Sequence, residues 1–238
     1  MAAADLAVAL RDVERNYHAL RPLRIRHLDL HQGESIAVLG LDQAAAEVLV
    51  NLITGATLPD KGTVAIFGTD TASIADADTW MKALDDFGIL SERVVLLDEM
   101  TAEQNLLLPL TLDIHDAADT IRAQVRAVAE EVGLDPSLLR HPAASLAPAA
   151  RLRLRLGKAL AARPRVLLAE HPNATLPPDD IPAFAADLSG IISRRSIAAL
   201  ILTADRTFGR ATAGQVLTLQ PATGDLAASA GWRQWFGG

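Results

Sequence analysis

The sequence predicts an α/β fold built on a mostly parallel sheet, with an antiparallel β subdomain at the N-terminus. Short apolar strands alternate with helix-like segments along residues 35–219, and this alternation is typical of a parallel sheet covered by helices. Alanine and leucine supply most of the apolar content, while aromatic residues make up only 4%, which favours helices packed on a sheet over a β-sandwich. The 238 residues are enough for one such domain with a small inserted lobe.

A β-hairpin is expected at the start of the chain. Residues 6–13 and 22–30 alternate apolar and polar positions around a polar connection, as the two strands of a hairpin do. A turn at Gln32 and Gly33 then leads into residues 35–39. This stretch is apolar without a break, which suits a strand in a sheet covered on both faces.

A helix is expected after the turn at Gly40. The apolar residues Val48, Leu52 and Ile53 share one face at helical spacing. The alanines at 44–46 are also strong helix formers, so an earlier start of this helix is the alternative.

The middle of the chain predicts two strands and two helices. Residues 58–68 form a turn and a strand, and a further short strand is expected around 94–97. Helical patterns follow at 102–110 and 117–132, and the second ends at Gly133, as helices often do.

Residues 151–156 alternate leucine and arginine, which taken alone would indicate a strand. Strong helix formers occupy nearly all of 149–162, and Leu152, Leu156 and Leu160 fall four apart on one face, so we predict a helix. The remaining elements are a strand at 166–169, a helix at 179–192 and strands at 197–203 and 215–219. The tail with Trp232 and Trp235 is either docked on the domain or a partner contact.

The charge balance argues against broad nucleic-acid binding. The net charge is -7, and no part of the sequence resembles a basic face large enough to displace counterions from a phosphate backbone. We interpret the cluster Arg151, Arg153 and Arg155 as a solvated or interface face of a helix. The chain has no cysteine, so disulfides and thiolate metal sites are excluded.

No export signal or membrane span is expected from the sequence. The N-terminus lacks a basic leader, and Asp5 interrupts its apolar stretch. No apolar run approaches the roughly 20 residues needed to cross a bilayer. Any membrane role is therefore expected to come through a partner.

Taken in order, six segments resemble the ATP-binding subunit of ABC transporters. They are residues 12–17, 31–40, 51–70, 99–110, 162–172 and 201–206. The resemblance covers almost the whole chain, and the fourth segment is similar to the branch that serves lipoprotein-release and macrolide-type exporters. It implies a P-loop NTPase-like (RecA-like) fold, a single nucleotide-binding domain over 1–238 and a helical lobe inserted at approximately 92–160.

The segment that resembles the phosphate loop, Gly40 to Glu47, lacks the residues that hold a phosphate. A working loop has glycines, a lysine for the β and γ phosphates and a hydroxyl for magnesium. Aligned from Gly40, these last two positions hold Ala46 and Glu47, and Asp42 adds an acid. A carboxylate about 4 Å from a phosphate charge costs about 4 kcal/mol at an effective dielectric near 20. The alternative for Glu47 is an acid in the first helical turn that interacts with the helix dipole.

The resemblance places substitutions at the other catalytic positions too. Glu92 stands where the family has a glutamine that touches magnesium and the attacking water, and Glu170 replaces the magnesium-binding aspartate. His171 replaces the glutamate that polarises water, and it is either a base or a structural histidine. Ala204 replaces the switch histidine. Tyr17 would lie under the adenine ring, unless it is only a hairpin tyrosine.

The signature loop of the family, Leu-Ser-Gly-Gly-Gln, is replaced by Leu146-Ala147-Pro148-Ala149-Ala150. The hydroxyl, both glycines and the amide are missing, and Pro148 removes a backbone N–H. In an ABC dimer each nucleotide lies between the phosphate loop of one subunit and the signature of the other, so both composite sites would be damaged.

Three functions follow as hypotheses. The first is a catalytically degenerate ABC subunit, a pseudoenzyme with absent or very weak hydrolysis. It would dock on a permease through residues 92–110, or on a second ABC ATPase subunit as a homo- or heterodimer, and would be cytoplasmic and peripheral at the inner face of the cell membrane. The second is a working exporter ATPase that binds ATP through Tyr17 and backbone amides, with Mg²⁺ held by Glu47 or Glu170. The third is a soluble regulator that binds neither nucleotide nor transporter.

Overall fold

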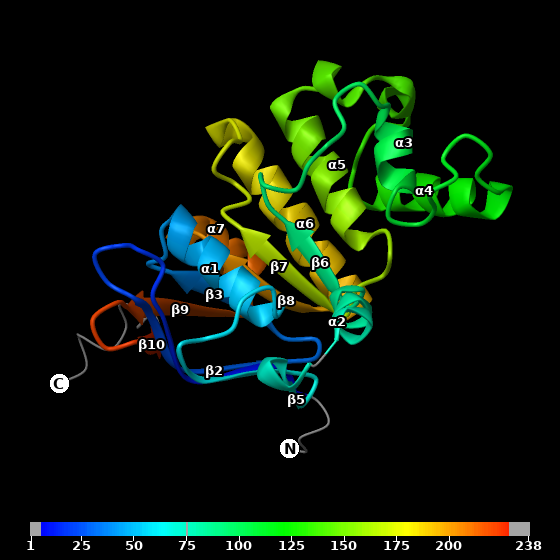
Figure 1. Ribbon diagram of the computed structural model, residues 1–238. Coiled ribbons are helices and arrows are strands. Elements are labelled where there is room, and N and C mark those ends of the chain that lie inside the picture. The colour runs from blue at the N-terminus through cyan, green and yellow to red at the C-terminus, as the bar shows by residue number, and fades with distance from the viewer. Residues whose placement is uncertain (1–5, 75, 229–238) are drawn as a thin grey trace.

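The computed structural model describes residues 6–74 and 76–228, and it shows an α/β fold with two sheets (Figure 1). The strands are β1 (Leu6–Arg15), β2 (Leu23–His31), β3 (Ser35–Leu39), β4 (Lys61–Ile66), β5 (Thr69–Asp70), β6 (Phe87–Leu90), β7 (Val166–Glu170), β8 (Ala198–Leu202), β9 (Gln215–Gln220) and β10 (Asp225–Ala228). The α-helices are α1 (Gln43–Ile53), α2 (Ala77–Leu84), α3 (Ala102–Leu107), α4 (Asp119–Glu131), α5 (Pro148–Leu160), α6 (Ile181–Arg195) and α7 (Arg206–Thr212). Short 3₁₀ turns lie at Thr71–Ser73, Pro136–Arg140, Ala143–Ser145 and Pro178–Asp180.

The first sheet is antiparallel and has the order β2-β1-β4-β5. Its register places Leu10 opposite Leu28 on one side and opposite Val64 on the other, and these side chains are buried. The hairpin expected at the N-terminus is confirmed, and it continues into β4. Alternation of apolar and polar residues therefore sets which face of this sheet packs inward.

The second sheet has the order β10-β9-β3-β8-β7-β6 and is parallel from β9 to β6. Every residue of β7 and β8 is buried, as expected for apolar strands covered on both faces. The mostly parallel sheet predicted from the sequence is confirmed.

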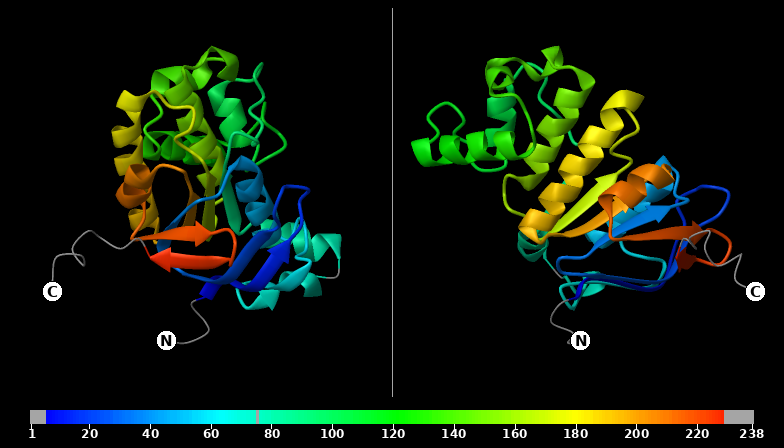
Figure 2. Two further views of the ribbon diagram at one scale, coloured as in Figure 1. Left: turned by 90° about the vertical axis from the view of Figure 1, so that its left-hand side faces the viewer. Right: turned by 180° about the vertical axis from the view of Figure 1, so that it is seen from behind.

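Helix α1 lies between the two sheets and belongs to one of two cores. Its buried residues pack with side chains of β1, β2, β3 and β4. The second core lies on the opposite face of the parallel sheet, where α5, α6 and α7 cover the strands (Figure 2). The helices α3 and α4 pack against α5 and extend away from the sheets, which is visible in both figures.

Several predicted elements are wrong or were missed. Residues 94–97 form a loop, and the strand is β6 at Phe87–Leu90, because these residues pair with β7. Gly88 masks this strand in the sequence, yet a Cβ at that position would overlap the backbone carbonyl of Ala159 in α5. The pattern also missed α2, α7 and β10. Trp232 and Trp235 lie outside the described residues.

The helix at 149–162 is confirmed as α5, but of the two interpretations of its arginines the solvated one is wrong. Arg151, Arg153 and Arg155 do not form a solvated face; they make ion pairs with Asp98, Asp187 and Glu92 respectively, and their side chains are 25%, 19% and 10% exposed. No helix within the described ranges combines the length and apolar character needed to cross a bilayer.

Candidate functional site

The first turn of α1 holds the segment that the sequence singles out as a degenerate phosphate loop. The helix begins at Gln43 because the carboxylate of Asp42 caps it and accepts a hydrogen bond of 2.8 Å from the Ala45 amide. The Ala46 amide donates to the Asp42 carbonyl at 2.9 Å, and the Ala46 side chain is fully buried. The earlier of the two predicted starts is therefore confirmed.

Glu47 is not an acid of the first helical turn, so that interpretation is wrong. With the helix starting at Gln43, the first turn contains no acid, and Asp42 provides the negative charge near the helix N-terminus. Glu47 lies one turn further on, half-exposed, with its Oε1 3.4 Å from the Arg93 guanidinium.

Tyr17 and Gly40 lie together at the mouth of a small cavity of about 110 Å³, which Asp42, Ala45 and Leu219 also line. Burial, and after it the charge of Asp42, raise the pKa of the Tyr17 hydroxyl above its ordinary value. Gly40 has φ +91°, and a Cβ there would come within 3.0 Å of the Leu219 carbonyl oxygen. The structure thus joins two of the three predicted site residues in one place, while Glu47 is directed to Arg93.

Arg93, whose side chain is 36% exposed, forms an ion pair with the fully buried Glu170 next to α1. Glu170 ends β7, and its side chain has no exposed surface. It accepts hydrogen bonds from the Ser91 hydroxyl at 2.7 Å, from Arg93 Nε at 3.0 Å and from Arg93 Nη2. The bond with Glu170 is the main cause that raises the pKa of Arg93 above its ordinary value. One guanidinium therefore links Glu170 on β7 with Glu47 on α1.

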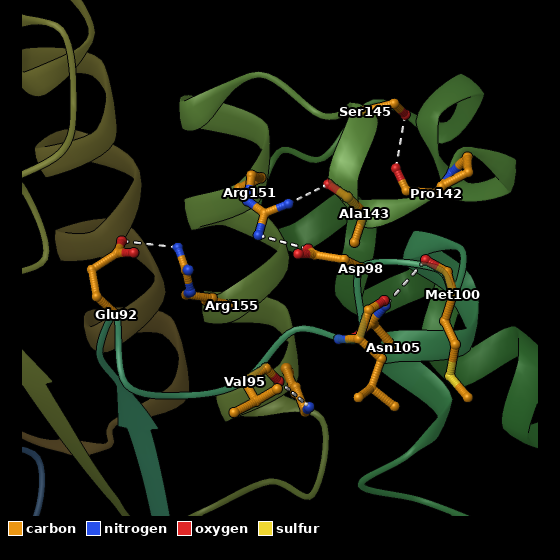
Figure 3. A network of polar contacts seen from close by, with 12 residues as sticks. Glu92, Val95, Asp98, Met100, Asn105, Pro142, Ala143, Ser145, Arg151 and Arg155 are labelled. Carbon is orange, nitrogen blue, oxygen red and sulfur yellow. Dashed lines mark hydrogen bonds and ion pairs between the residues drawn. The ribbon is translucent and has the colours of Figure 1, made fainter.

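Glu92 points in a different direction, toward the helices. Its Oε1 accepts a hydrogen bond from Arg155 at 2.8 Å (Figure 3). It also accepts one from the Thr175 hydroxyl at 3.1 Å. Arg155 lies on α5 and Thr175 follows β7, so Glu92 ties the helices to the sheet. The hydrogen-bond partners of Glu92 are therefore different from those of Glu170.

His171 directly follows β7, and Ala204 lies two residues after the end of the neighbouring strand β8. His171 has φ +43°, and its buried Nε2 has no hydrogen-bond partner. Its backbone amide donates to the Leu202 carbonyl at 2.7 Å, which extends the pairing of β7 and β8. Ala204 is exposed, and the polar contacts here belong instead to Thr203, whose hydroxyl bonds Asn173 at 3.1 Å.

Residues 146–150, which the sequence aligns with the signature loop, lead directly into α5. The helix has Ala147 at its N-cap without a side-chain hydrogen bond, and Pro148 occupies the first turn. Leu146 is buried, so its side chain packs into the core and does not face a partner. This helix start offers neither a hydroxyl nor a glycine amide to a phosphate.

The loop from Glu92 to Asp98, which we call the docking loop, is held in place by polar contacts from two helices (Figure 3). The buried side chain of Asn105 on α3 both accepts from and donates to the Leu97 backbone, at 2.8 and 3.0 Å. On α5, Arg151 bonds the Asp98 carboxylate at 2.9 Å and Lys158 donates to the Val95 carbonyl at 2.8 Å. Burial lowers the pKa of Lys158.

Within this ordered loop two apolar side chains remain accessible. Val95 is 66% exposed and Leu97 is 38% exposed. The backbone of the loop is therefore fixed, while these two apolar side chains remain exposed to solvent.

Sequence reasoning missed Arg93. An arginine just after a strand usually indicates a solvated side chain, and its partners Glu47 and Glu170 lie 46 and 77 positions away. The only local hint is Glu170 itself, because an acid at the end of a fully apolar strand needs a buried partner.

The sequence of the chain matches a known protein family. Residues 23–174 match the family model described as ABC transporter. The methionine import ATP-binding protein MetN of Brucella abortus (strain 2308) is 28% identical over 212 residues, which are 89% of this chain. The chain spans only 57% of the length of that relative.

Two lipoprotein-releasing system ATP-binding proteins match over most of their length. LolD of Alcanivorax borkumensis is 29% identical over 195 residues, covering 82% of this chain and 85% of the relative. LolD 2 of Caulobacter vibrioides is 28% identical over 211 residues, covering 87% and 92%.

Solved structures share the fold. The bacterial ABC transporter cassette MJ0796, solved as a dimer, has a TM-score of 0.78 at 20% identity and covers 94% of this chain and 100% of its own. The cbiO1 protein from Clostridium perfringens, part of the cbiONQ transporter complex, also has a TM-score of 0.78, at 18% identity, with 94% and 87% covered.

Proposed function

The chain belongs to the ABC transporter family, and we propose that it is an ATP-binding-subunit homologue that has lost ATP turnover and acts as a structural or regulatory subunit. In this proposal residues 1–238 form a single cassette with a helical lobe at approximately 92–160. The cassette docks on a permease, on a second ABC ATPase subunit or on both, and lies in the cytoplasm at the inner face of the cell membrane.

The observation that carries this proposal is the first turn of α1, where backbone N–H groups already have hydrogen-bond acceptors within the chain. In a phosphate loop, free backbone N–H groups at the helix N-terminus point toward the phosphates. Here the Ala45 amide already donates to the Asp42 carboxylate at 2.8 Å, and the Ala46 amide donates to the Asp42 carbonyl. An anion of the chain itself thus takes a place that a phosphate would need.

The charged residues argue in the same direction. Alanine occupies position 46, where a phosphate loop would have a lysine, and its methyl group is buried. Glu47 brings a carboxylate whose repulsion of a phosphate about 4 Å away costs about 4 kcal/mol at an effective dielectric near 20. Arg93 offsets Glu47 in part, but its guanidinium is already bound by Glu170. A magnesium-bound triphosphate therefore does not fit the residues present.

The cavity beside Tyr17 is the one feature that favours the alternative, a working ATPase with atypical residues. Its volume of about 110 Å³ is well below the roughly 300 Å³ at which ligand pockets begin, so a nucleotide base would have to open it. Asp42, which lines the same cavity, opposes a phosphate there.

Docking is supported by the docking loop. Its backbone is fixed by Asn105, Arg151 and Lys158, while Val95 and Leu97 are exposed. Because the loop is already ordered, a partner that covers these two side chains would lose little entropy on binding. We expect the cytoplasmic helices of a permease to be that partner.

A nucleotide titration tests the loss of turnover. The purified chain is titrated with a fluorescent ATP analogue and Mg²⁺, and phosphate release is measured in parallel, with LolD of Alcanivorax borkumensis as the control protein. No saturable binding up to millimolar nucleotide is expected for this chain. Saturable binding with turnover would refute the proposal, and binding without turnover would redirect it to a nucleotide sensor.

The double variant Ala46→Lys with Glu47→Ser asks whether those two side chains are all that is missing. We expect it not to restore binding, because the Asp42 cap still closes the helix start and a lysine at position 46 would begin in the core. Restored binding would mean that the helix start is not the obstacle.

A further inference from the structure

Glu170 is a buried carboxylate that the structure satisfies entirely with side chains. Its side chain has no exposed surface, and it receives the Ser91 hydroxyl at 2.7 Å and two N–H groups of Arg93. A carboxylate buried in this way needs a cation and hydrogen bonds, because leaving it without them is costly. Arg93 supplies both.

The guanidinium of Arg93 also reaches a second carboxylate. Its Nη1 lies 3.4 Å from Glu47 Oε1, while Nε and Nη2 face Glu170. The two acids come from α1 and β7, which are far apart in sequence. A single positive charge therefore lies between two carboxylates from separate elements, and carboxylates are also the ligands that divalent cations such as Mg²⁺ bind.

We propose that Arg93 is a tethered cation that takes the place of a divalent metal ion in this cassette. It joins α1, β6 and β7 through one side chain, so the chain holds these elements together with no metal or nucleotide bound. The inference deepens the proposed function, since it rests on the conclusion that a magnesium nucleotide does not fit the site.

A consequence follows for a chain without Arg93. Glu47 and Glu170 would lose the cation that they share, while Ser91 would keep its hydrogen bond to Glu170. Carboxylates and water are ligands that suit Mg²⁺ and Mn²⁺. Removing the arginine is therefore expected to create a divalent-cation site that the natural chain lacks.

The test uses the full chain, Mn²⁺ alone and no nucleotide. Free Mn²⁺ is measured by electron paramagnetic resonance, and thermal unfolding is followed with and without 1 mM Mn²⁺. The natural chain is expected to bind no Mn²⁺ saturably and to keep its Tm. For Arg93→Gln we expect a Tm lower by about 10 °C, because a buried carboxylate loses its cation, and a recovery of roughly half of that loss with Mn²⁺.

Two further variants separate the metal site from general damage. Arg24→Gln is the control for the loss of an arginine. Arg24 forms an ion pair with Glu14, and its side chain is 41% exposed, compared with 36% for Arg93. Arg24→Gln should gain no Mn²⁺ binding. The double variant Arg93→Gln with Glu170→Gln removes the buried charge, so its Tm should exceed that of Arg93→Gln, again without Mn²⁺ binding.

The outcomes are distinct. Mn²⁺ binding by the natural chain as tight as that of Arg93→Gln would overturn the inference, as would a folded Arg93→Gln variant that binds none. If Arg93→Gln does not fold, a double variant that folds supports Arg93 as the cation that the buried Glu170 requires, and a double variant that also does not fold refutes it. Nucleotide binding by the natural chain would refute the proposed function separately, since no nucleotide enters the Mn²⁺ experiment.

Discussion

The ion pair between Glu92 and Arg155 is expected to stabilise the joint between the sheet and helix α5. Glu92 Oε1 lies 2.8 Å from Arg155 Nη1, and the Arg155 side chain is only 10% exposed, with its buried Nε left without a partner. Changing Glu92→Ala would leave this arginine nearly buried without a counterion, and it would also remove the acceptor of the Thr175 hydroxyl.

The magnitude follows from the geometry. Two unit charges 2.8 Å apart attract by about 6 kcal/mol at an effective dielectric near 20. The Glu92 side chain is 42% exposed, however, so water screens the ion pair. Water would also solvate the Glu92 carboxylate in a variant that lacks Arg155. We expect Glu92→Ala to cost about 2 to 3 kcal/mol, and Arg155→Met less than about 1 kcal/mol, because methionine fills the space and buries no charge.

A double-mutant cycle in urea measures the coupling. Glu92→Ala should lower the unfolding midpoint by about 1 M. The double variant Glu92→Ala with Arg155→Met should be more stable than Glu92→Ala by about 1 to 2 kcal/mol, which gives a coupling of about 1 to 3 kcal/mol. Glu92→Gln is the matched control, because it keeps the acceptor for Thr175 while removing the charge. If Glu92→Ala costs less than about 0.5 kcal/mol, or the two changes simply add, the buried arginine does not depend on Glu92.

Three further outcomes are expected. The pKa of Glu131 is lowered, chiefly by its hydrogen bonds from Arg195, so this carboxylate stabilises the fold above its ordinary pKa of 4.5. That stability should be lost as the pH falls below 4.5 toward the lowered pKa, and acid titration of Glu131→Gln should show a shallower loss. Gly62→Ala, at φ +79°, should cost more than about 2 kcal/mol, because its Cβ would overlap carbonyl oxygens of β1; Gly68→Ala, at φ +81° in open space, should cost only about 1 kcal/mol in a urea titration. Asp42→Ala should destabilise the chain by about 1 kcal/mol through loss of the α1 cap, measured the same way, and no loss would mean that the cap is not formed.

Much of the fold was predictable because its signals are local. The fully apolar runs at β3, β7 and β8 indicated a sheet covered on both faces, and the structure buries these strands. Leucines four apart identified α5 despite the period-two alternation of arginine. Prediction from sequence failed where a strand depends on pairing with a distant segment. The strand β6 was missed because Gly88 weakens its pattern, although pairing with β7 makes it a strand.

The sequence predicted which residues lie at the candidate site, but not which side chains they contact. Spacing from Gly40 located Ala46 and Glu47, and the structure places both on α1. The partner of Glu47 was not predictable, because Arg93 lies 46 positions further along the chain.

The sequence by itself determined the α/β class, the order of most elements and the residue types at each site position, since periodicity and composition are read from neighbours along the chain. Only the tertiary structure decided which charges meet. Burial makes an unpaired charge costly, so Glu170 must find a cation, and the fold brings Arg93 across 77 positions to supply it. That pairing depends on how β6, β7 and α1 pack side by side, which no short stretch of sequence records.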